Sequence, residues 1–297
     1  MPGLTSRDQA REVAPQYFDP ITRRPATWVN DSGLIQRMPG RFDIVKGDTW
    51  LGNVGDQYRV LNNWDALESL DSLMRDPNGP RYETMGELWG GRVFFALAVL
   101  PESITVKGTD EVKPYLFLYN SHDGSSAVKV MLTMVRVVCN NTAQYALSDT
   151  SLGSYAARHS GDILGKMANV SDALGLIHAE TVALNDLFNR FAECEPTKAQ
   201  IESILSTLFP ATATNRSELQ KERVLQLAAN GTGNAAFSGT AWSLLNGITE
   251  LEDHVNNQVT AKSKEDAADS RFRSLLYGSA QARKSKAIDT IREVCLI

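Results

Sequence analysis

The chain has 297 residues, of which 42% are hydrophobic and 22% are charged, with a formal net charge of −5 and a pI of about 5.5. This composition is ordinary for a globular protein, and the acidic balance means that any binding to nucleic acid needs a local basic surface. The longest apolar run, Val93 to Leu100, is far shorter than the roughly 20 residues that span a bilayer, which excludes a membrane-spanning helix.

The N-terminal quarter predicts an arm, a hairpin and a helix. Residues 1–40 are rich in Pro, Arg and Asp and predict an irregular arm with one short helix at Ser6–Val13. From Arg41 to Leu61, two Gly-Asp pairs between short apolar stretches predict a β-hairpin. A helix is expected next, capped by Asn62 or Asn63 and ended by the following Pro-Asn-Gly-Pro sequence.

Residues 80–139 predict an antiparallel meander with short connections. Its strands are expected in the segments ETMGELW, RVFFALAVL, VKPYLFLYN and AVKVMLTMVRVVC. The capping sequence Asn-Asn-Thr after Cys139 predicts a short helix toward Leu147. The extended sequence SYAARHS then leads into long helical stretches that Pro and Gly residues separate.

These elements predict an α+β fold: an antiparallel β-meander in the N-terminal half with one early helix, followed by a mainly helical C-terminal half. Three segments are expected. They are an N-terminal arm (1–40), a β-rich α+β core (41–160) and a helical region that packs on the core (161–297).

The cysteines and histidines indicate the environment of the chain. Cys139, Cys194 and Cys295 are far apart and form no CxxC pair, which argues against a disulfide scaffold and a zinc site. The four histidines are not spaced as metal ligands. The N-terminus has no apolar segment of a secretory signal. The expectation is a cytoplasmic protein without metal, cofactor or membrane association.

The loop Ser121–Ser126 is the first candidate site. Its N–H groups and hydroxyls around a glycine can bind an anion such as phosphate, and an Asx-type turn is the structural alternative. His122 next to Asp123 also suggests catalysis, with a serine or Cys139 as nucleophile. Because no GxSxG, HExxH or P-loop motif accompanies the pair, no catalytic residue is assigned.

One strand of the meander carries aromatic residues beside a cation. The two-residue period of a strand places these side chains on one face: Lys113, Tyr115, Phe117 and Tyr119. Such a face can stack the bases of a single strand, and Pro114 suggests an edge position at which it is reachable. The alternative is an apolar sheet face that packs under helices.

Several cations are candidates for phosphate contact. Arg136 stands alone in an apolar strand face, so it needs either a carboxylate partner or a ligand phosphate. Arg158 and His159 lie in a polar extended segment, as ordinary surface residues or as phosphate contacts. Near the C-terminus, an excess of cations indicates a solvated helix face or a phosphate-binding surface. These cations are Arg271, Arg273, Arg283, Lys284, Lys286 and Arg292.

Four blocks of sequence carry a resemblance to a known family. They are LGNVGDQYRVLNN, LWGGRVFFALAVLPE, YLFLYNSHDGSSAVKVMLTMVRVVCNNT, and the C-terminal pair GTAWSLLNGITELEDH and RFRSLLYGSAQARKSKA. With these blocks the chain resembles the phage/plasmid-like proteins grouped as domain of unknown function 932, whose genes often lie near replication and recombination functions. At fold level the resemblance extends to single-strand annealing proteins. It implies an α+β protein that assembles into rings or filaments and holds one DNA strand without catalysis.

The leading hypothesis is a phage or mobile-element protein that binds single-stranded DNA and acts in annealing or recombination. It would be a homo-oligomer, in a ring or filament, in the host bacterial cytoplasm. The DNA-binding residues expected are Arg92, Lys113, Tyr115, Tyr119, His122, Lys129, Arg136, Arg158 and His159. One alternative is a phage-encoded inhibitor or decoy of a host protein. The other is a nuclease or hydrolase that uses His122 and Asp123.

Overall fold

The structure is a computed structural model that describes residues 3–74, 77–137, 141–144, 154–170, 177–211, 215–256 and 264–297. The chain forms two compact units. The first unit contains residues 1–101, 115–132 and 148–177, and the second contains residues 102–114, 133–147 and 178–297. The three-segment division expected from the sequence stays a prediction.

The first unit begins with two short helices. Helix α1 (Arg7–Val13) starts after Ser6, whose side-chain oxygen accepts a hydrogen bond from the Gln9 amide at 3.3 Å. A 3₁₀ helix, η1 (Pro15–Phe18), follows. The predicted short helix at Ser6–Val13 is therefore confirmed, and a polar N-cap explains where it begins.

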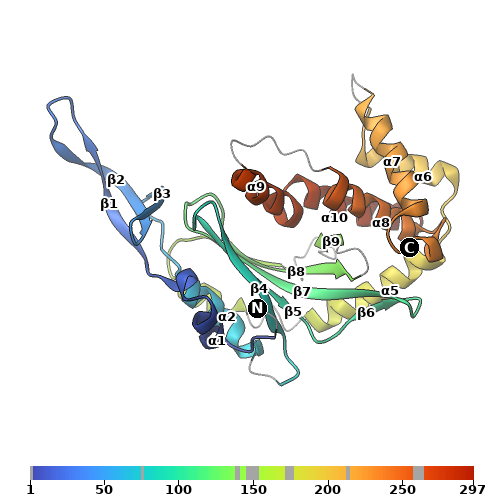
Figure 1. The fold of residues 1–297 in the computed structure, drawn as a ribbon, viewed down its shortest axis with the longest axis horizontal. Coiled ribbons are helices and arrows are strands. Elements are labelled where there is room, and N and C mark those ends of the chain that lie inside the picture. Colours follow the sequence, from blue (N-terminus) through green and yellow to red (C-terminus); the bar gives the residue numbers. More distant parts are fainter. Residues whose placement is uncertain are drawn as a thin grey trace. The chain divides into compact units, whose positions relative to one another are not determined.

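A three-stranded antiparallel sheet follows, in the order β1-β2-β3: β1 (Ile21–Val29), β2 (Ile35–Lys46) and β3 (Thr49–Gly55). The β2–β3 pair confirms the predicted hairpin. The expected irregular arm is wrong for β1 and for the first part of β2, which pair from Ile21↔Lys46 to Val29↔Ile35. Pro25 lies at a register shift, where the strand tolerates a residue without an N–H. Figure 1 shows β1 and β2 as a two-stranded ribbon that reaches away from α1.

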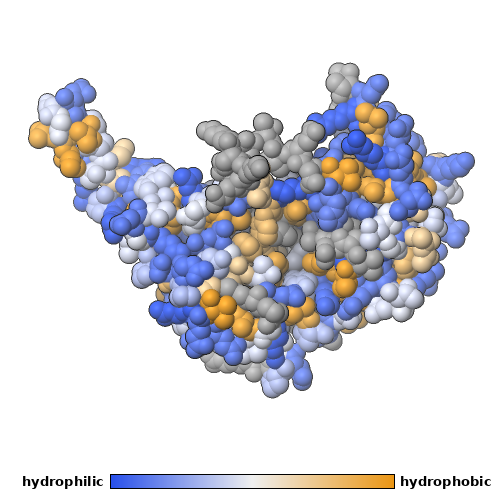
Figure 2. All heavy atoms as spheres, in the orientation of Figure 1, coloured by the Kyte–Doolittle hydropathy of each residue, from blue (hydrophilic) through white to orange (hydrophobic). Residues whose placement is uncertain are grey.

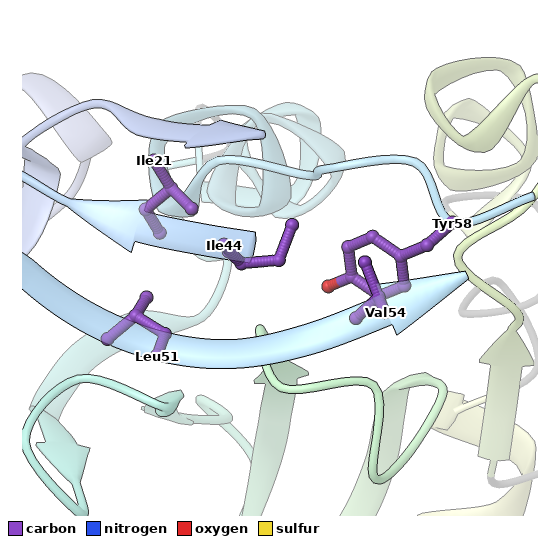
Figure 3. Close-up of a cluster of buried hydrophobic side chains, with 5 residues drawn as sticks. All are labelled: Ile21, Ile44, Leu51, Val54 and Tyr58. Atoms are coloured by element: carbon purple, nitrogen blue, oxygen red, sulfur yellow. The ribbon is translucent and has the colours of Figure 1, made fainter. Parts of the chain in front are cut away.

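The base of this ribbon has its own hydrophobic core. Ile21, Ile44, Leu51, Val54 and Tyr58 form a buried cluster from all three strands and the segment after β3 (Figure 3). The Tyr58 hydroxyl leaves this cluster to donate a hydrogen bond to the Ser121 carbonyl at 2.9 Å. The ribbon is therefore anchored at its base, beside the loop that the sequence singled out.

A second, seven-stranded sheet has the order β10-β8-β7-β5-β4, with β6 paired to β7 and β9 paired to β8. Its strands are β4 (Arg81–Leu88), β5 (Val93–Val99), β6 (Ile104–Val106), β7 (Asp110–Ser121), β8 (Val128–Arg136), β9 (Asn141–Gln144) and β10 (Ser154–Ala157). Helix α2 (Asn63–Met74) precedes this sheet, as the sequence predicts. The antiparallel meander is confirmed.

Two local predictions about this sheet are wrong. Asn141 and Thr142 belong to strand β9 and not to a helix, because their backbone pairs with the free edge of β8 at Arg136 and Val135. Pro114 does not mark an edge strand, since β7 lies between β5 and β8. The β5 ladder stops at Tyr115 and the β6 ladder begins at Val112, so Pro114 falls in the gap between them.

The rest of the chain is mainly helical, which confirms the α+β class. The elements are α3 (Ile163–Ala168) in the first unit, and α5 (Ile177–Glu193), α6 (Lys198–Leu208), α7 (Arg216–Asn230), η2 (Ala235–Phe237), α8 (Ala241–Glu250), the π-helix η3 (Leu251–Val255), α9 (Lys264–Tyr277) and α10 (Ser279–Val294) in the second. Helix α8 is buried from Ala241 to Thr249. Within the described ranges, no helix has the length and apolarity needed to cross a membrane.

Candidate functional site

A pocket of about 660 Å³ lies in the first unit beside the loop between β7 and β8. Three segments line it: Gly55 to Tyr58 after β3, Gly124 to Ala127 in the loop, and Arg158 to Ser160 after β10. The sequence suggested the loop and the Arg158-His159 pair separately as phosphate contacts. The structure brings them together in one pocket whose lining carries hydroxyl and guanidinium groups.

The loop is held by an Asx turn. Asp123 Oδ1 accepts hydrogen bonds from Ser121 Oγ at 2.7 Å and from the Ser125 amide at 2.9 Å. Burial raises the pKa of Asp123, but the hydrogen bonds from Ser125 and Ser121 and the charge of Arg92 outweigh it, so the pKa is lowered overall. The loop therefore forms the Asx-type turn that the sequence allowed as an alternative to an anion-binding loop. The turn places Gly124, Ser125 and Ser126 in the lining of the pocket.

Strand β3 lies directly against this loop. A Cβ atom on Gly52 would lie 2.7 Å from Asp123 Cα, a distance that side chains do not tolerate. Glycine is therefore needed at position 52 for close backbone approach. The base of the ribbon and the loop are in contact as a result.

His159 forms one wall of the pocket. Its ring is 6% exposed and stacks on Tyr58, with centroids 4.7 Å apart and planes 14° apart. Its Nδ1 lies 3.1 Å from the Arg59 carbonyl, which can only accept, so Nδ1 carries the proton and Nε2 is an acceptor. Within the part of the chain that the structure describes, Nε2 has no hydrogen-bond partner. Burial lowers the pKa of His159 to about 4, so the ring is neutral at pH 7.

Three arginines lie around the segment Gly55–Tyr58, and we call them the basic rim: Arg23, Arg59 and Arg158. Arg23 and Arg59 each donate to the Asp56 carbonyl at 2.9 Å. Arg41 lies on the other face of this sheet from Arg23, and its guanidinium donates to Asn53, so it is not part of the rim. Arg158 is exposed and lines the pocket itself. Because Arg23 and Arg59 share the Asp56 carbonyl, the two cations lie close together, and burial and the charge of Arg59 lower the pKa of Arg23.

Sequence reasoning missed two members of the basic rim. Arg23 belongs to strand β1, which the sequence assigned to an irregular arm. Arg59 lies in the predicted hairpin, but its position beside Arg23 depends on the register of three strands. The available signal was the density of arginines among the first sixty residues.

His122 is a core residue and does not reach a ligand. Its side chain is fully buried, and its Nε2 lies 2.8 Å from Asn63 Oδ1. Asn63 in turn donates to the Tyr17 carbonyl at 2.7 Å. Burial lowers the pKa of His122 to about 3. In the described part of the chain no hydrogen bond joins His122 to Asp123, and Cys139 lies outside the described residues.

The aromatic face of β7 is mostly the underside of a packed sheet. Phe117 is fully buried and Tyr119 is 2% exposed, so neither can stack on a base. Tyr115 is half-buried, and its pKa is raised by burial and by a hydrogen bond with Glu83. Phe117 and Tyr119 therefore belong to a packed sheet face, which the sequence allowed as the alternative to base stacking.

The remaining predicted cations differ in their surroundings. Arg136 is 3% exposed and forms an ion pair with Asp110, so its partner is a carboxylate and not a ligand phosphate. Arg92 is exposed, and its guanidinium lies 5.5 Å from the centre of the Trp50 ring. Lys113 and Lys129 are half-buried. No group of three or more His, Cys, Asp or Glu side chains in the described ranges could hold a metal ion.

Comparison with known proteins gives one match. A family model described as a domain of unknown function (DUF932) matches residues 50–276. The chain belongs to this family. No curated protein and no solved structure matches it. In this DUF932 chain the matched range covers β3 from Trp50 onward, the Ser121–Ser126 loop, Arg59 and Arg158, whereas Arg23 precedes it.

Proposed function

We propose that this DUF932 chain binds single-stranded DNA and promotes annealing during recombination, as a non-catalytic homo-oligomer encoded by a phage or mobile element. Its place of action is the bacterial cytoplasm. The observation that carries the proposal is the basic rim, in a chain whose net charge is −5. Arg158 lines an open pocket, and Arg23 and Arg59 meet at the carbonyl of Asp56, which lies between the two lining residues Gly55 and Gln57. Local cations of this kind supply the phosphate contacts that dominate affinity for nucleic acid.

The pocket and its rim suit a phosphodiester backbone. Arg158 and the exposed Ser125 face an open pocket, in which hydroxyl and guanidinium groups can donate to phosphate oxygens. Arg23 and Arg59 are held in place by the same carbonyl, so their guanidinium groups are partly ordered before a ligand arrives. Ordering before binding reduces the entropy lost when a flexible strand binds.

An exposed tryptophan of the ribbon supplies the stacking surface that Tyr119 cannot. Trp50 is 50% exposed on β3. Indole rings beside arginines are typical of sequence-tolerant binding to single strands, because every base has a face on which to stack. Trp50 with Arg92 is such a pair, which keeps Arg92 among the proposed contacts.

The oligomeric part of the proposal is supported by the far end of the ribbon. Apolar side chains gather there (Figure 2), and they are Trp28, Val29, Leu34, Ile35 and Met38. Both strands of this end are solvent-exposed, so its apolar residues have no core of their own to enter. Exposed apolar clusters of this kind mark association surfaces, and we assign this one to a second copy of the chain.

The test is fluorescence anisotropy of a labelled single-stranded oligonucleotide across a salt series. We expect affinity to fall as salt rises, and Arg158→Ala and Arg23→Ala each to lower the slope of log K against log salt by about 0.7. Arg24→Ala is the matched control, because successive strand residues point to opposite faces. Absence of binding at low salt by the folded protein would contradict the proposal, as would equal losses in Arg23→Ala and Arg24→Ala.

A further inference from the structure

A second pocket, of about 440 Å³, lies among the helices of the second unit. Three arginines from three helices line it: Arg216 in α7, Arg271 in α9 and Arg283 in α10. Its polar lining includes Ser217, Gln220, Asn256, Ser274 and Ser279, and its apolar lining is Leu208, Phe209 and Pro210. The pocket therefore combines a cluster of cations with an adjoining apolar wall.

A buried carboxylate orients two of these arginines. Glu252 is 3% exposed, and its Oε1 accepts a hydrogen bond from Arg283 Nη1 at 2.5 Å. The backbone carbonyl of Glu252 accepts from Arg271 Nη2 at 2.5 Å. Arg271 Nη1 donates to the Asn256 carbonyl at 2.9 Å. Because these bonds fix both guanidinium groups from one side, the pocket is preorganised for an anion.

The segment that supplies Glu252 is the π-helix η3. Its wider turn is closed by the hydrogen bond from the Asn256 amide to the Leu251 carbonyl at 2.8 Å. Such single turns of π-helix occur mostly within α-helices and frequently at functional sites. Here the turn places consecutive acidic residues against consecutive cations: Glu252 against Arg283, and Asp253 against Lys284.

The cations of the last two helices, α9 and α10, divide into two roles. Lys284 is fully buried and pairs with Asp253 at 2.7 Å, and Lys286 Nζ donates to the Thr207 carbonyl at 3.1 Å. These two residues hold helices together. Arg271 and Arg283 instead line the pocket, together with Arg216. Of the cations that the sequence singled out, Lys284 and Lys286 are therefore structural, and Arg271 and Arg283 face the pocket.

Arg216 adds a charge that no protein group in the described ranges neutralises. It is exposed, and no hydrogen bond or ion pair to it is present within them. It begins α7, whose N-cap residue Asn215 makes no side-chain hydrogen bond to the first turn. The unbonded N–H groups and the dipole of a 15-residue helix at this end favour an anion near Arg216 and Ser217.

We propose that this pocket binds a small phosphorylated molecule. Three arginines and one glutamate leave two positive charges, which match the charge of about −2 on a phosphate monoester at pH 7. The phosphate lies between Arg216, Arg271 and Arg283. The organic part of the ligand lies against Pro210, the exposed member of the apolar lining. This site is independent of the basic rim, since it lies in the other unit.

The test is isothermal titration calorimetry of the full chain with pyrophosphate, ADP and adenosine. We expect ADP to bind at least tenfold more tightly than adenosine, because only ADP carries phosphates. Arg216→Ala should weaken ADP binding at least tenfold without affecting folding, since Arg216 is exposed. Arg283→Gln should do the same. Arg190→Ala is the matched control, an exposed arginine on α5 outside the pocket, and should bind ADP as the unmodified chain does.

Three results would overturn this proposal. One is failure of both pyrophosphate and ADP to bind, and another is equal ADP affinity in Arg216→Ala and Arg190→Ala. The third is loss of oligonucleotide affinity in Arg216→Ala while ADP does not bind, which would assign the pocket to nucleic acid. Arg158→Ala distinguishes this site from the proposed function, since it should weaken oligonucleotide binding and leave ADP binding unchanged.

Discussion

Arg136 and Asp110 form a buried ion pair in the second unit, with Arg136 Nε 2.7 Å from Asp110 Oδ2. The same carboxylate oxygen accepts a hydrogen bond from Trp242 Nε1 at 2.8 Å. Arg136 Nη1 and Nη2 donate to the carbonyls of Thr232 and Gly233 at 2.9 and 3.0 Å. The guanidinium thus joins the ends of two strands to the turn before α8, and it is a structural group in this fold.

Arg136→Met should destabilise the protein by about 3–5 kcal/mol, because it leaves the Asp110 carboxylate buried without its cation. Urea unfolding followed by circular dichroism measures this change. Arg292→Met is the matched control, since its pair with Asp289 is long, at 3.8 Å, and partly exposed. The control should lose less than about 1 kcal/mol. Equal losses in the two variants would contradict the structural role of Arg136.

Gly52→Ala should destabilise the first unit and displace the Ser121–Ser126 loop. The added Cβ would lie 2.7 Å from Asp123 Cα, and overpacking of this kind typically costs about 1–3 kcal/mol. Gly55→Ala is a control in the same strand, because its Cβ would meet no atom within 4 Å. Thermal unfolding compares the stability of the two variants, and oligonucleotide affinity reports the position of the loop. A Gly52→Ala protein as stable as Gly55→Ala would show that β3 and the loop are not held this closely.

Stability should fall as the pH falls from 7 to 5. The pKa of His122 is lowered to about 3 and that of His159 to about 4, both by burial, whereas an unfolded histidine has a pKa of about 6.5. The unfolded chain therefore binds protons that the folded chain does not. Below about pH 6.5 each histidine should lower the free energy of unfolding by about 1.4 kcal/mol per pH unit.

Urea unfolding at pH 7.5, 6 and 5 checks this dependence, and His159→Phe serves as the comparison. The phenylalanine keeps a ring against Tyr58 but cannot take up a proton, so the variant should lose the share of the slope due to His159. A free energy of unfolding that stays constant between pH 7.5 and 5 would show that the two histidines are not buried as neutral groups.

Much of the fold could be predicted because its signals are local. Turns at Gly47 and Gly90 separate apolar strands, and Ser6 and Asn63 lie at helix starts, so the meander and the early helices follow from short stretches of sequence. Strand β1 was missed because Pro25 and two arginines interrupt its alternation. The strand forms because it pairs with β2, and this pairing depends on the fold and not on the local sequence of β1.

The candidate site could be predicted only in part, because burial depends on contacts distant in sequence. Arg158 and the Ser121–Ser126 loop were found from their residue types alone. From the sequence, His122 cannot be distinguished from a surface histidine. Only the fold shows that its ring is in the core, where its Nε2 lies beside Asn63, 59 residues earlier in the chain. Arg23 could be placed beside Arg59 only once the β1–β2 register was known.

The far end of the ribbon should control self-association. Val29 and Ile35 face each other across the β1–β2 ladder, and they are 62% and 74% exposed. Val29→Lys with Ile35→Lys places two charges in this apolar cluster, so the homo-oligomer should dissociate toward monomers. The cooperative unfolding transition should be unchanged, since neither side chain enters the core.

Size-exclusion chromatography with light scattering measures the mass. A matched variant, Thr27→Lys, adds one charge at an exposed position nearer the base of β1 and should stay oligomeric. An unchanged mass in the double variant would contradict the assignment of this ribbon end to self-association, and oligonucleotide binding by the resulting protein would show whether the basic rim works independently of it.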